Sequence, residues 1–325
     1  MLSELAFTAD DLALTRFAVS QMWEVVTSFR LLASGSAHPV HRPWLDQVRP
    51  RVAAAGLDSG WLADLVPSSN YLPDFLTPPP GEPAPALAAE LAAIRATPAD
   101  QVRADLGTLD GKSRGGARRR ALHTDPGTQL TRVTEEIEAY WEVALAPYWA
   151  KIHALLDAEL FRRSRQVAEH GSGHLFNDLH STLRWDDNTL HLVRRRCGIS
   201  RASTGPGLLL VPSVFAVHVF TWSRPPAPPQ LAYPVRGIGT LWETGRVRRA
   251  DAIAAVIGRS RTTLLIELAA PASTTDLARR TGISAAGVSQ HLTALRDAGM
   301  VSAHRAGRSV LYARTAMAES LLTTS

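Results

Sequence analysis

The sequence predicts an α+β protein: a mostly helical amino-terminal domain with a small antiparallel β region, then a carboxy-terminal domain of three helices closed by a β-hairpin. Helical periodicity dominates the first 170 residues, and short apolar segments punctuated by Pro and Gly follow them. A chain of 325 residues exceeds the ~250 residues at which one hydrophobic core stops growing. We therefore expect two domains, residues 1–245 and residues 246–325.

The amino-terminal helices are predicted from apolar periodicity and from capping residues. Ser20 is a suitable N-cap for a helix that runs to about Ala33 and carries one apolar face: Met22, Val25, Val26, Phe29 and Leu32. Further helices are expected at Pro43 to Ala55, at Ala86 to Ala96, from Thr97 onward, and from Thr128 to about His170 with a break at Pro147. The glycine-rich and arginine-rich segment from Gly107 to Gly127 is expected to be an exposed loop.

The β region is predicted after Gly171-Ser172-Gly173. Its strands are expected at Leu183 to Trp185 and Leu190 to Val193, around a turn at Asp186-Asp187-Asn188, and then at Leu208 to Trp222 and Leu231 to Val235.

Composition and charge exclude several classes of protein. The net charge of +5 comes almost entirely from arginine, which suits a phosphate-bearing partner, although a GC-rich genome produces the same enrichment. Cys197 is the only cysteine, so an internal disulfide and a thiolate-rich metal site are excluded. Residues Met1 to Asp10 lack the basic segment of a signal peptide, and the apolar run Gly207 to Phe220 is too short to span a bilayer. We expect a cytoplasmic protein with no membrane partner.

The last domain carries the most specific pattern. A helix is predicted from Ala252 to Leu268 and stops before Pro271. Ser273 caps a second helix, Thr274 to Arg280, and the turn Thr281-Gly282-Ile283 leads to a third helix, Ala285 to Ala298, which Ser284 caps.

The third helix has two distinct faces. Val288, Leu292 and Leu295 fall at i, i+4 and i+7 and are expected to be buried. The opposite face holds small and polar residues: Ala286, Ser289, Gln290 and Thr293. Small side chains let a helix enter the major groove of DNA, where Ser, Thr and Gln bind base edges or phosphates, so this helix is predicted to recognise DNA.

A β-hairpin is predicted next, from Val301 to His304 and from Ser309 to Ala313, with Arg305 and Arg308 at its tip as a wing. For His291, packing or a hydrogen bond in the turn is as well supported as a phosphate contact. The predicted DNA-binding residues are Ser284, Ala286, Ser289, Gln290, His291, Thr293, Arg305 and Arg308.

These segments closely resemble the ArsR family of winged helix-turn-helix repressors over residues 251–316. The likeness rests on Leu277 to Ser284, Val288-Ser289-Gln290-His291-Leu292, Leu295 to Gly299 and Gly307 to Tyr312. The resemblance implies a homodimer on a palindromic double-stranded operator, with repression relieved by a signal. Metal-sensing members carry a cysteine box where this chain has Ser273-Thr274-Thr275-Asp276-Leu277, and the His/Asp set of other members is missing from Thr315 to Ser325. Metal sensing at those sites is therefore not expected.

The first 240 residues resemble, less specifically, the long uncharacterised amino-terminal region of some ArsR-type regulators. The cues are Asp10-Asp11-Leu12, Arg16 to Ser20 before Trp23-Glu24, and Gly207 to Ser213. This likeness brings no known ligand. We expect residues 1–245 to sense a small-molecule effector or to support dimerisation.

Other readings of the sequence compete with this one. No phosphate loop, nucleophile elbow or dinucleotide fingerprint is present, so no catalysis and no cofactor are expected. The alternative is that the winged helix serves protein–protein assembly beside a ligand-binding or enzymatic amino-terminal domain. His170 and His174 are not expected to bind a metal, because Gly171 and Gly173 break their helical register. Cys197 is expected to be a core residue rather than a redox sensor, and Tyr140, Trp141, Tyr148 and Trp149 to build core.

Overall fold

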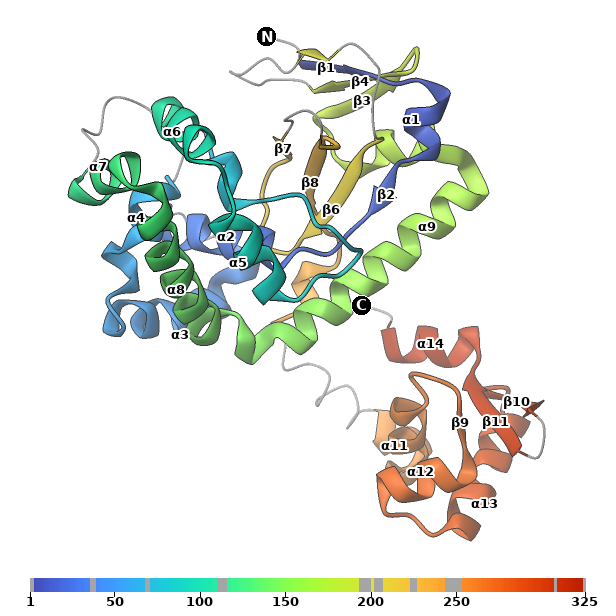
Figure 1. Ribbon diagram of the computed structural model, residues 1–325. Helices are drawn as coiled ribbons and strands as arrows, with labels where there is room; N and C mark the ends of the chain where they lie inside the picture. The colour runs from blue at the N-terminus through green and yellow to red at the C-terminus, as the bar shows by residue number, and fades with distance from the viewer. Residues whose placement is uncertain are drawn as a thin grey trace. The chain divides into compact units, whose positions relative to one another are not determined.

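The computed structural model describes residues 3–35, 39–67, 71–109, 116–192, 200–201, 207–222, 227–242, 253–306 and 309–323. Its internal contacts divide the chain into two compact units, Met1–Trp242 and Glu243–Ser325 (Figure 1). The predicted α+β class is confirmed, since helices and small sheets occur in both units.

Helix α2 (Gln21–Ala33) lies at the centre of the first unit. Its N-cap is Ser20, whose Oγ accepts a hydrogen bond from the backbone N–H of Trp23 at 3.1 Å, as predicted. The surrounding helices are α3 (Arg42–Ala54), α4 (Trp61–Leu65), α5 (Leu87–Arg95), α6 (Ala99–Thr108), α7 (Ala117–Thr124), α8 (Pro126–Ala144) and α9 (Trp149–Leu179). Met22 and Val25 are fully buried, so α2 contributes to the core around most of its circumference.

The described part of the first unit also contains two small four-stranded sheets. The first has the order β3-β4-β1-β5, from β3 (Leu183–Asp186), β4 (Thr189–Leu192), β1 (Ser3–Ala6) and β5 (Ser200–Arg201). The second has the order β2-β6-β8-β7, from β2 (Arg16–Phe17), β6 (Leu209–Ser213), β8 (Gln230–Pro234) and β7 (Phe220–Trp222). The short helix α1 (Ala9–Ala13) connects β1 to β2.

The small antiparallel β region predicted from the sequence is present, and it is joined by parallel pairings that were not predicted. The β3–β4 hairpin is antiparallel and turns at Asp187 and Asn188, both with positive φ, as predicted. Strands β2, β6 and β8, however, pair in parallel, and β5 is parallel to β1. All five residues of β6 are buried, and such a continuous apolar strand is typical of parallel sheets covered on both faces.

Alternate residues of the second sheet contribute to two different cores. Leu209, Val211 and Ala232 join the large core around α2, whereas Leu210 and Leu231 join a smaller core. The smaller core also contains Leu175, Phe176 and Leu179 of α9 and the apolar residues of β3 and β4. Figure 1 shows α9 running along this sheet, and the helix therefore links both cores.

Two helix boundaries in the first unit differ from prediction. Residues 117–124 form helix α7 rather than a loop, because Leu122 is fully buried and Arg119 donates to the carbonyl oxygen of Asp64 at 2.6 Å. Residues 110–115 of the predicted loop lie outside the described residues. Helix α9 continues past His170 to Leu179 through a kink at Gly171, where φ is 79°.

Trp242 is the last described residue of the first unit and lies in an aromatic cluster. Its Nε1–H donates to Nδ1 of the buried His41 at 3.2 Å, and its ring lies 5.6 Å from Tyr148 and 6.0 Å from Phe215. Trp44 packs on Phe215 at 4.6 Å. These contacts fix the point at which the described chain leaves the first unit.

The second unit contains α11 (Arg259–Glu267), β9 (Ala272–Ser273), α12 (Thr274–Thr281), α13 (Ala285–Asp297), β10 (Val301–Ala306), β11 (Ser309–Arg314) and α14 (Ala316–Thr323). The predicted single helix from Ala252 to Leu268 is wrong: residues 253–257 are helical, but Gly258 adopts a φ of 90° and a new helix begins at Arg259. Neither α14 nor β9, which pairs with β11, was predicted.

None of the helices within the described ranges combines the length and the apolar character that crossing a lipid bilayer demands.

Candidate nucleic-acid interface

Helices α12 and α13 are joined by a short turn whose ends are capped as predicted. Ser273 Oγ accepts from the backbone N–H of Asp276 at 3.2 Å and donates to its Oδ2 at 2.7 Å, and this bond lowers the pKa of Asp276. Gly282 ends α12 with a φ of 74°, and Ser284 Oγ accepts from the backbone N–H of Gly287 at 3.2 Å. Local hydrogen bonds therefore cap the amino ends of both helices, and Gly282 ends α12 at the turn between them.

One face of α13 is buried. Val288 and Leu292 are fully buried and Leu295 is 2% exposed, which confirms the predicted apolar stripe. These residues pack with Leu264 and Leu265 of α11, Leu277 of α12 and Val301 of β10 in the only large core of this unit's described part. The core holds α13 rigidly against the other helices.

The opposite face of α13 is exposed, and it contains Ala286, Ser289, Gln290 and Thr293. Thr293 Oγ1 donates to the carbonyl oxygen of Ser289 at 3.0 Å, so its hydroxyl proton is already used within the helix. Within the described part of the chain, the side-chain amide of Gln290 makes no hydrogen bond and its donor and acceptor are both available. This face offers hydrogen-bonding groups on a narrow surface with little bulk.

Gly287 lies in this region but was not among the residues predicted to matter for the helix-turn-helix. A Cβ at this position would lie 3.2 Å from Ile283 Cγ2 and from Ser284 Oγ, so a larger residue would crowd the turn. The one sequence signal was the glycine inside an otherwise helical pattern, which indicates close packing.

The hairpin β10–β11 forms the predicted wing. Its register runs from Val301 opposite Arg314 to Ala306 opposite Ser309, and β11 also pairs with β9 just before α12. Arg305 is exposed near the end of β10. Gly307 and Arg308 lie outside the described residues, and the role predicted for Arg308 stays a prediction.

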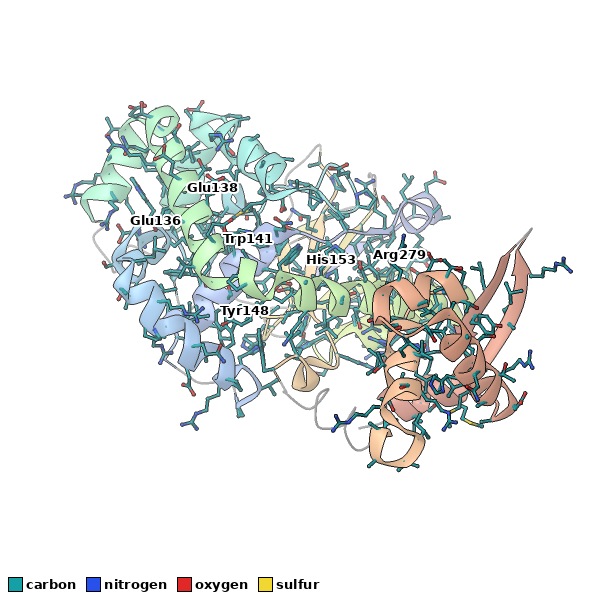
Figure 2. The ribbon with its side chains drawn as sticks, turned by 90° about the horizontal axis from the view of Figure 1, so that it is seen from below. Glu136, Glu138, Trp141, Tyr148, His153 and Arg279 are labelled. Atoms are coloured by element: carbon teal, nitrogen blue, oxygen red, sulfur yellow. The ribbon has the colours of Figure 1, made fainter. Side chains whose placement is uncertain are left out.

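His291 is half-buried beside the apolar stripe and makes no hydrogen bond within the described ranges. Ser284 is exposed at the start of α13 with its Oγ engaged as a cap. Arg279, which was not among the predicted contacts, projects from α12 with 79% of its side chain exposed and pairs with Asp276 at 3.3 Å (Figure 2).

The predicted separation of His170 and His174 in the first unit is wrong. Their rings lie 5.1 Å apart, although Gly171 between them has a non-helical φ of 79°. A search of the described residues finds no group of three or more His, Cys, Asp or Glu side chains that could hold a metal ion. Cys197 lies outside the described residues. Tyr140 and Trp141 are buried in the large core, as predicted.

The capped helix pair, the supporting core and the hairpin together define a winged helix-turn-helix, a class of DNA-binding domain. The family model described as "Bacterial regulatory protein, arsR family" matches residues 262–303, from α11 through α13 into β10. The resemblance predicted from the sequence is confirmed, and this segment is an ArsR-family domain, whose role is DNA binding in transcription regulation. Comparisons with curated proteins and with solved structures found no match.

Proposed function

We propose that this protein is a cytoplasmic homodimeric repressor that binds a specific double-stranded operator and is released by a small-molecule effector bound to its amino-terminal unit. In this proposal the protein acts by binding and not by catalysis. The observation that carries it is the exposed polar face of α13, which a buried aliphatic stripe holds against the helix-turn-helix core.

The composition of α13 supports insertion into the major groove. Ala286 and Ser289 add little bulk at the amino-terminal half of the helix, and Gln290 carries an amide that matches the donor and acceptor pair of adenine. In this arrangement Arg305 and Arg308 on the wing contact the flanking phosphates, and the positive guanidinium groups strengthen binding to any sequence.

Exposed apolar side chains on the outer elements of the second unit support a dimer. Val256 is 84% exposed, Ile266 44%, Met317 57% and Leu321 37%, although the unit has a well-formed core. Such side chains gain free energy when a second copy removes them from water. A two-fold dimer binds two half-sites about one helical turn apart, and we therefore expect a palindromic operator.

Two features of the first unit support a sensor role. It has its own hydrophobic cores, and specific contacts hold the last described residue of its chain. Trp242, held by His41 and the surrounding rings, is where the described part of this unit ends before the DNA-binding unit. In this proposal the effector binds the first unit and changes the structure around Trp242.

The test is a gel-shift titration of the full chain on DNA from upstream of its own coding region, with competitor DNA. Gln290→Ala should alter base preference at one position per half-site, at a cost of about 1–3 kcal/mol for the preferred base. Arg296→Gln, at the far end of the same helix, is the matched control and should leave base preference unchanged. If wild type and Gln290→Ala show the same base preference, Gln290 on α13 does not recognise a base. If the wild-type protein binds its upstream DNA no more tightly than it binds competitor DNA, the alternative of protein–protein assembly is favoured.

A further inference from the structure

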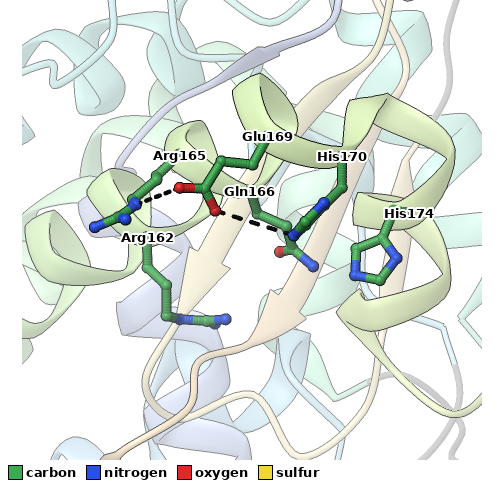
Figure 3. Close-up of a pocket in the computed structure, with 6 residues that line it drawn as sticks. All are labelled: Arg162, Arg165, Gln166, Glu169, His170 and His174. Atoms are coloured by element: carbon green, nitrogen blue, oxygen red, sulfur yellow. Dashed lines mark hydrogen bonds and ion pairs between the residues drawn. The ribbon is translucent and has the colours of Figure 1, made fainter.

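A surface hollow on α9 has an unusually cationic lining. It measures about 270 Å³ and is lined by Arg162, Arg165, Gln166, Glu169, His170 and His174 (Figure 3). Arginine and histidine therefore supply four of its six lining side chains, and Glu169 is its one carboxylate.

A buried ionic network lies behind this hollow. Arg163 is fully buried and donates to Glu159 at 2.7 Å, to Gln166 at 2.8 Å and to Asp178 at 2.8 Å. Burying a guanidinium costs more free energy than an apolar residue of the same size, so the network is a costly way to stabilise a helix. It does fix the positions of Arg162 and Gln166, because Arg162 binds the same Glu159 and Gln166 Nε2 binds the same Asp178.

The charges of the network and the hollow do not balance. Four guanidinium groups, those of Arg162, Arg163, Arg165 and Arg236, face three carboxylates, those of Glu159, Glu169 and Asp178. Although burial raises the pKa of Asp178, hydrogen bonds from Arg236 and Gln166 lower it to about 2, so this carboxylate is ionised. One positive charge therefore remains uncompensated among these seven side chains.

The hollow also has donors that its own residues leave available. Arg165 uses its Nε–H for Glu169 at 2.7 Å, while its two Nη groups bind nothing in the described part of the protein. The ring of His174 lies 5.1 Å from that of His170, whose Nε2 lies 4.0 Å from Glu169 (Figure 3). Guanidinium and imidazole N–H groups on one concave surface are typical of a site for an oxyanion.

We infer that this hollow on α9 binds a small organic molecule bearing a phosphate or carboxylate group. Its volume of about 270 Å³ leaves room for an uncharged part of the ligand beside the anionic group. Binding across the bend in α9 acts on both cores, since the helix contributes Leu156 to one and Phe176 to the other. The inference rests on the proposed sensor role of the first unit and names the chemistry of the effector.

The test is isothermal titration of the full-length protein, without DNA, using inorganic phosphate and succinate as separate probes at constant ionic strength. Both probes should bind saturably, and the probe with the higher affinity identifies the anionic group of the ligand. Arg165→Gln should lower the affinity for that probe by about tenfold or more. Arg184→Gln is the matched control, because Arg184 is also an exposed arginine (71% against 69%) paired with one carboxylate, Asp186. It should leave binding unchanged.

Two results would overturn the inference: saturable binding by neither probe, or equal binding by Arg165→Gln and Arg184→Gln. Thermal unfolding of both variants checks that each is folded. Operator binding is measured on the same samples by gel shift. An intact operator complex without anion binding refutes the site alone, whereas anion binding without an operator complex refutes the proposed function alone.

Discussion

The buried carboxyl group of Glu24 makes the stability of the first unit dependent on pH. Glu24 is fully buried in α2, and burial raises the pKa of its carboxyl group from 4.5 to about 8, against the lowering effect of hydrogen bonds from Val214, Phe215 and Ser213. Within the described part of the chain, no cationic side chain pairs with this carboxyl group. The folded unit therefore holds a proton on Glu24 at pH 7 that the unfolded chain releases.

The size of the effect follows from the pKa difference. Each pKa unit corresponds to about 1.4 kcal/mol, so a rise from 4.5 to about 8 is worth on the order of 5 kcal/mol between the acid and alkaline limits. Because the folded-state pKa is the higher one, this stability is fully present below pH 4.5 and is lost as the pH rises to about 8. Burial also raises the pKa of Glu90 to about 7, which adds a second loss in the same direction.

The perturbation is Glu24→Gln, which keeps the side-chain size but cannot ionise. Its carbonyl oxygen can accept from the backbone N–H of Val214, which is 2.8 Å from Glu24 Oε1, and its amide can donate to Ser213 Oγ. Near pH 4.5 the variant should match wild type. At pH 8.5 its free energy of unfolding should be higher by about 3–5 kcal/mol.

The assay is urea unfolding of the full chain at pH 4.5, 6, 7 and 8.5, followed by tryptophan fluorescence. All eight tryptophans of the chain precede residue 243, so the signal reports the first unit alone. Glu138→Gln, which removes an exposed glutamate from α8, is the control for the loss of one surface charge (Figure 2). The reasoning is refuted if the difference between Glu24→Gln and wild type is the same at pH 4.5 and at pH 8.5.

Two further predictions concern the second unit. Arg305→Gln should weaken binding to all DNA sequences. The plot of log K against log salt concentration, measured by gel shift, should become less steep by about one for each wing in contact with DNA. An unchanged slope would exclude Arg305 from phosphate contact. Leu292→Ala removes a fully buried side chain from the core behind α13 and should lower the free energy of unfolding of this unit by about 2–5 kcal/mol. Far-ultraviolet circular dichroism during urea unfolding measures that loss, and a change below 1 kcal/mol would contradict the role of Leu292 as a support.

Most of the winged helix was predictable because its signals are local. Ser273, Gly282 and Ser284 act within four residues of their own positions, and the stripe of Val288, Leu292 and Leu295 follows from the helical period alone. The break at Gly258 was missed, since an apolar pattern on both sides of a glycine also fits one continuous helix.

The first unit was less predictable because its strands pair across the whole chain. Arg16 in β2 lies opposite Leu209 in β6, and Glu4 in β1 lies opposite His191 in β4. Strands β1, β2 and β5, which were not predicted, carry too short an alternation to be recognised without a tight turn beside them, and their pairing follows from the packing of the segments between them. The same holds for α7, whose helical state depends on the burial of Leu122.

The sequence by itself determined the helix caps, the positive-φ turns and the apolar and polar faces of α13, because each depends on a residue's near neighbours in the chain. Only the tertiary structure decided that Glu24 is buried away from water and that Arg163 pairs with Asp178 behind a cationic hollow. Burial and charge balance arise from segments far apart in the chain, and no local pattern of residues encodes them.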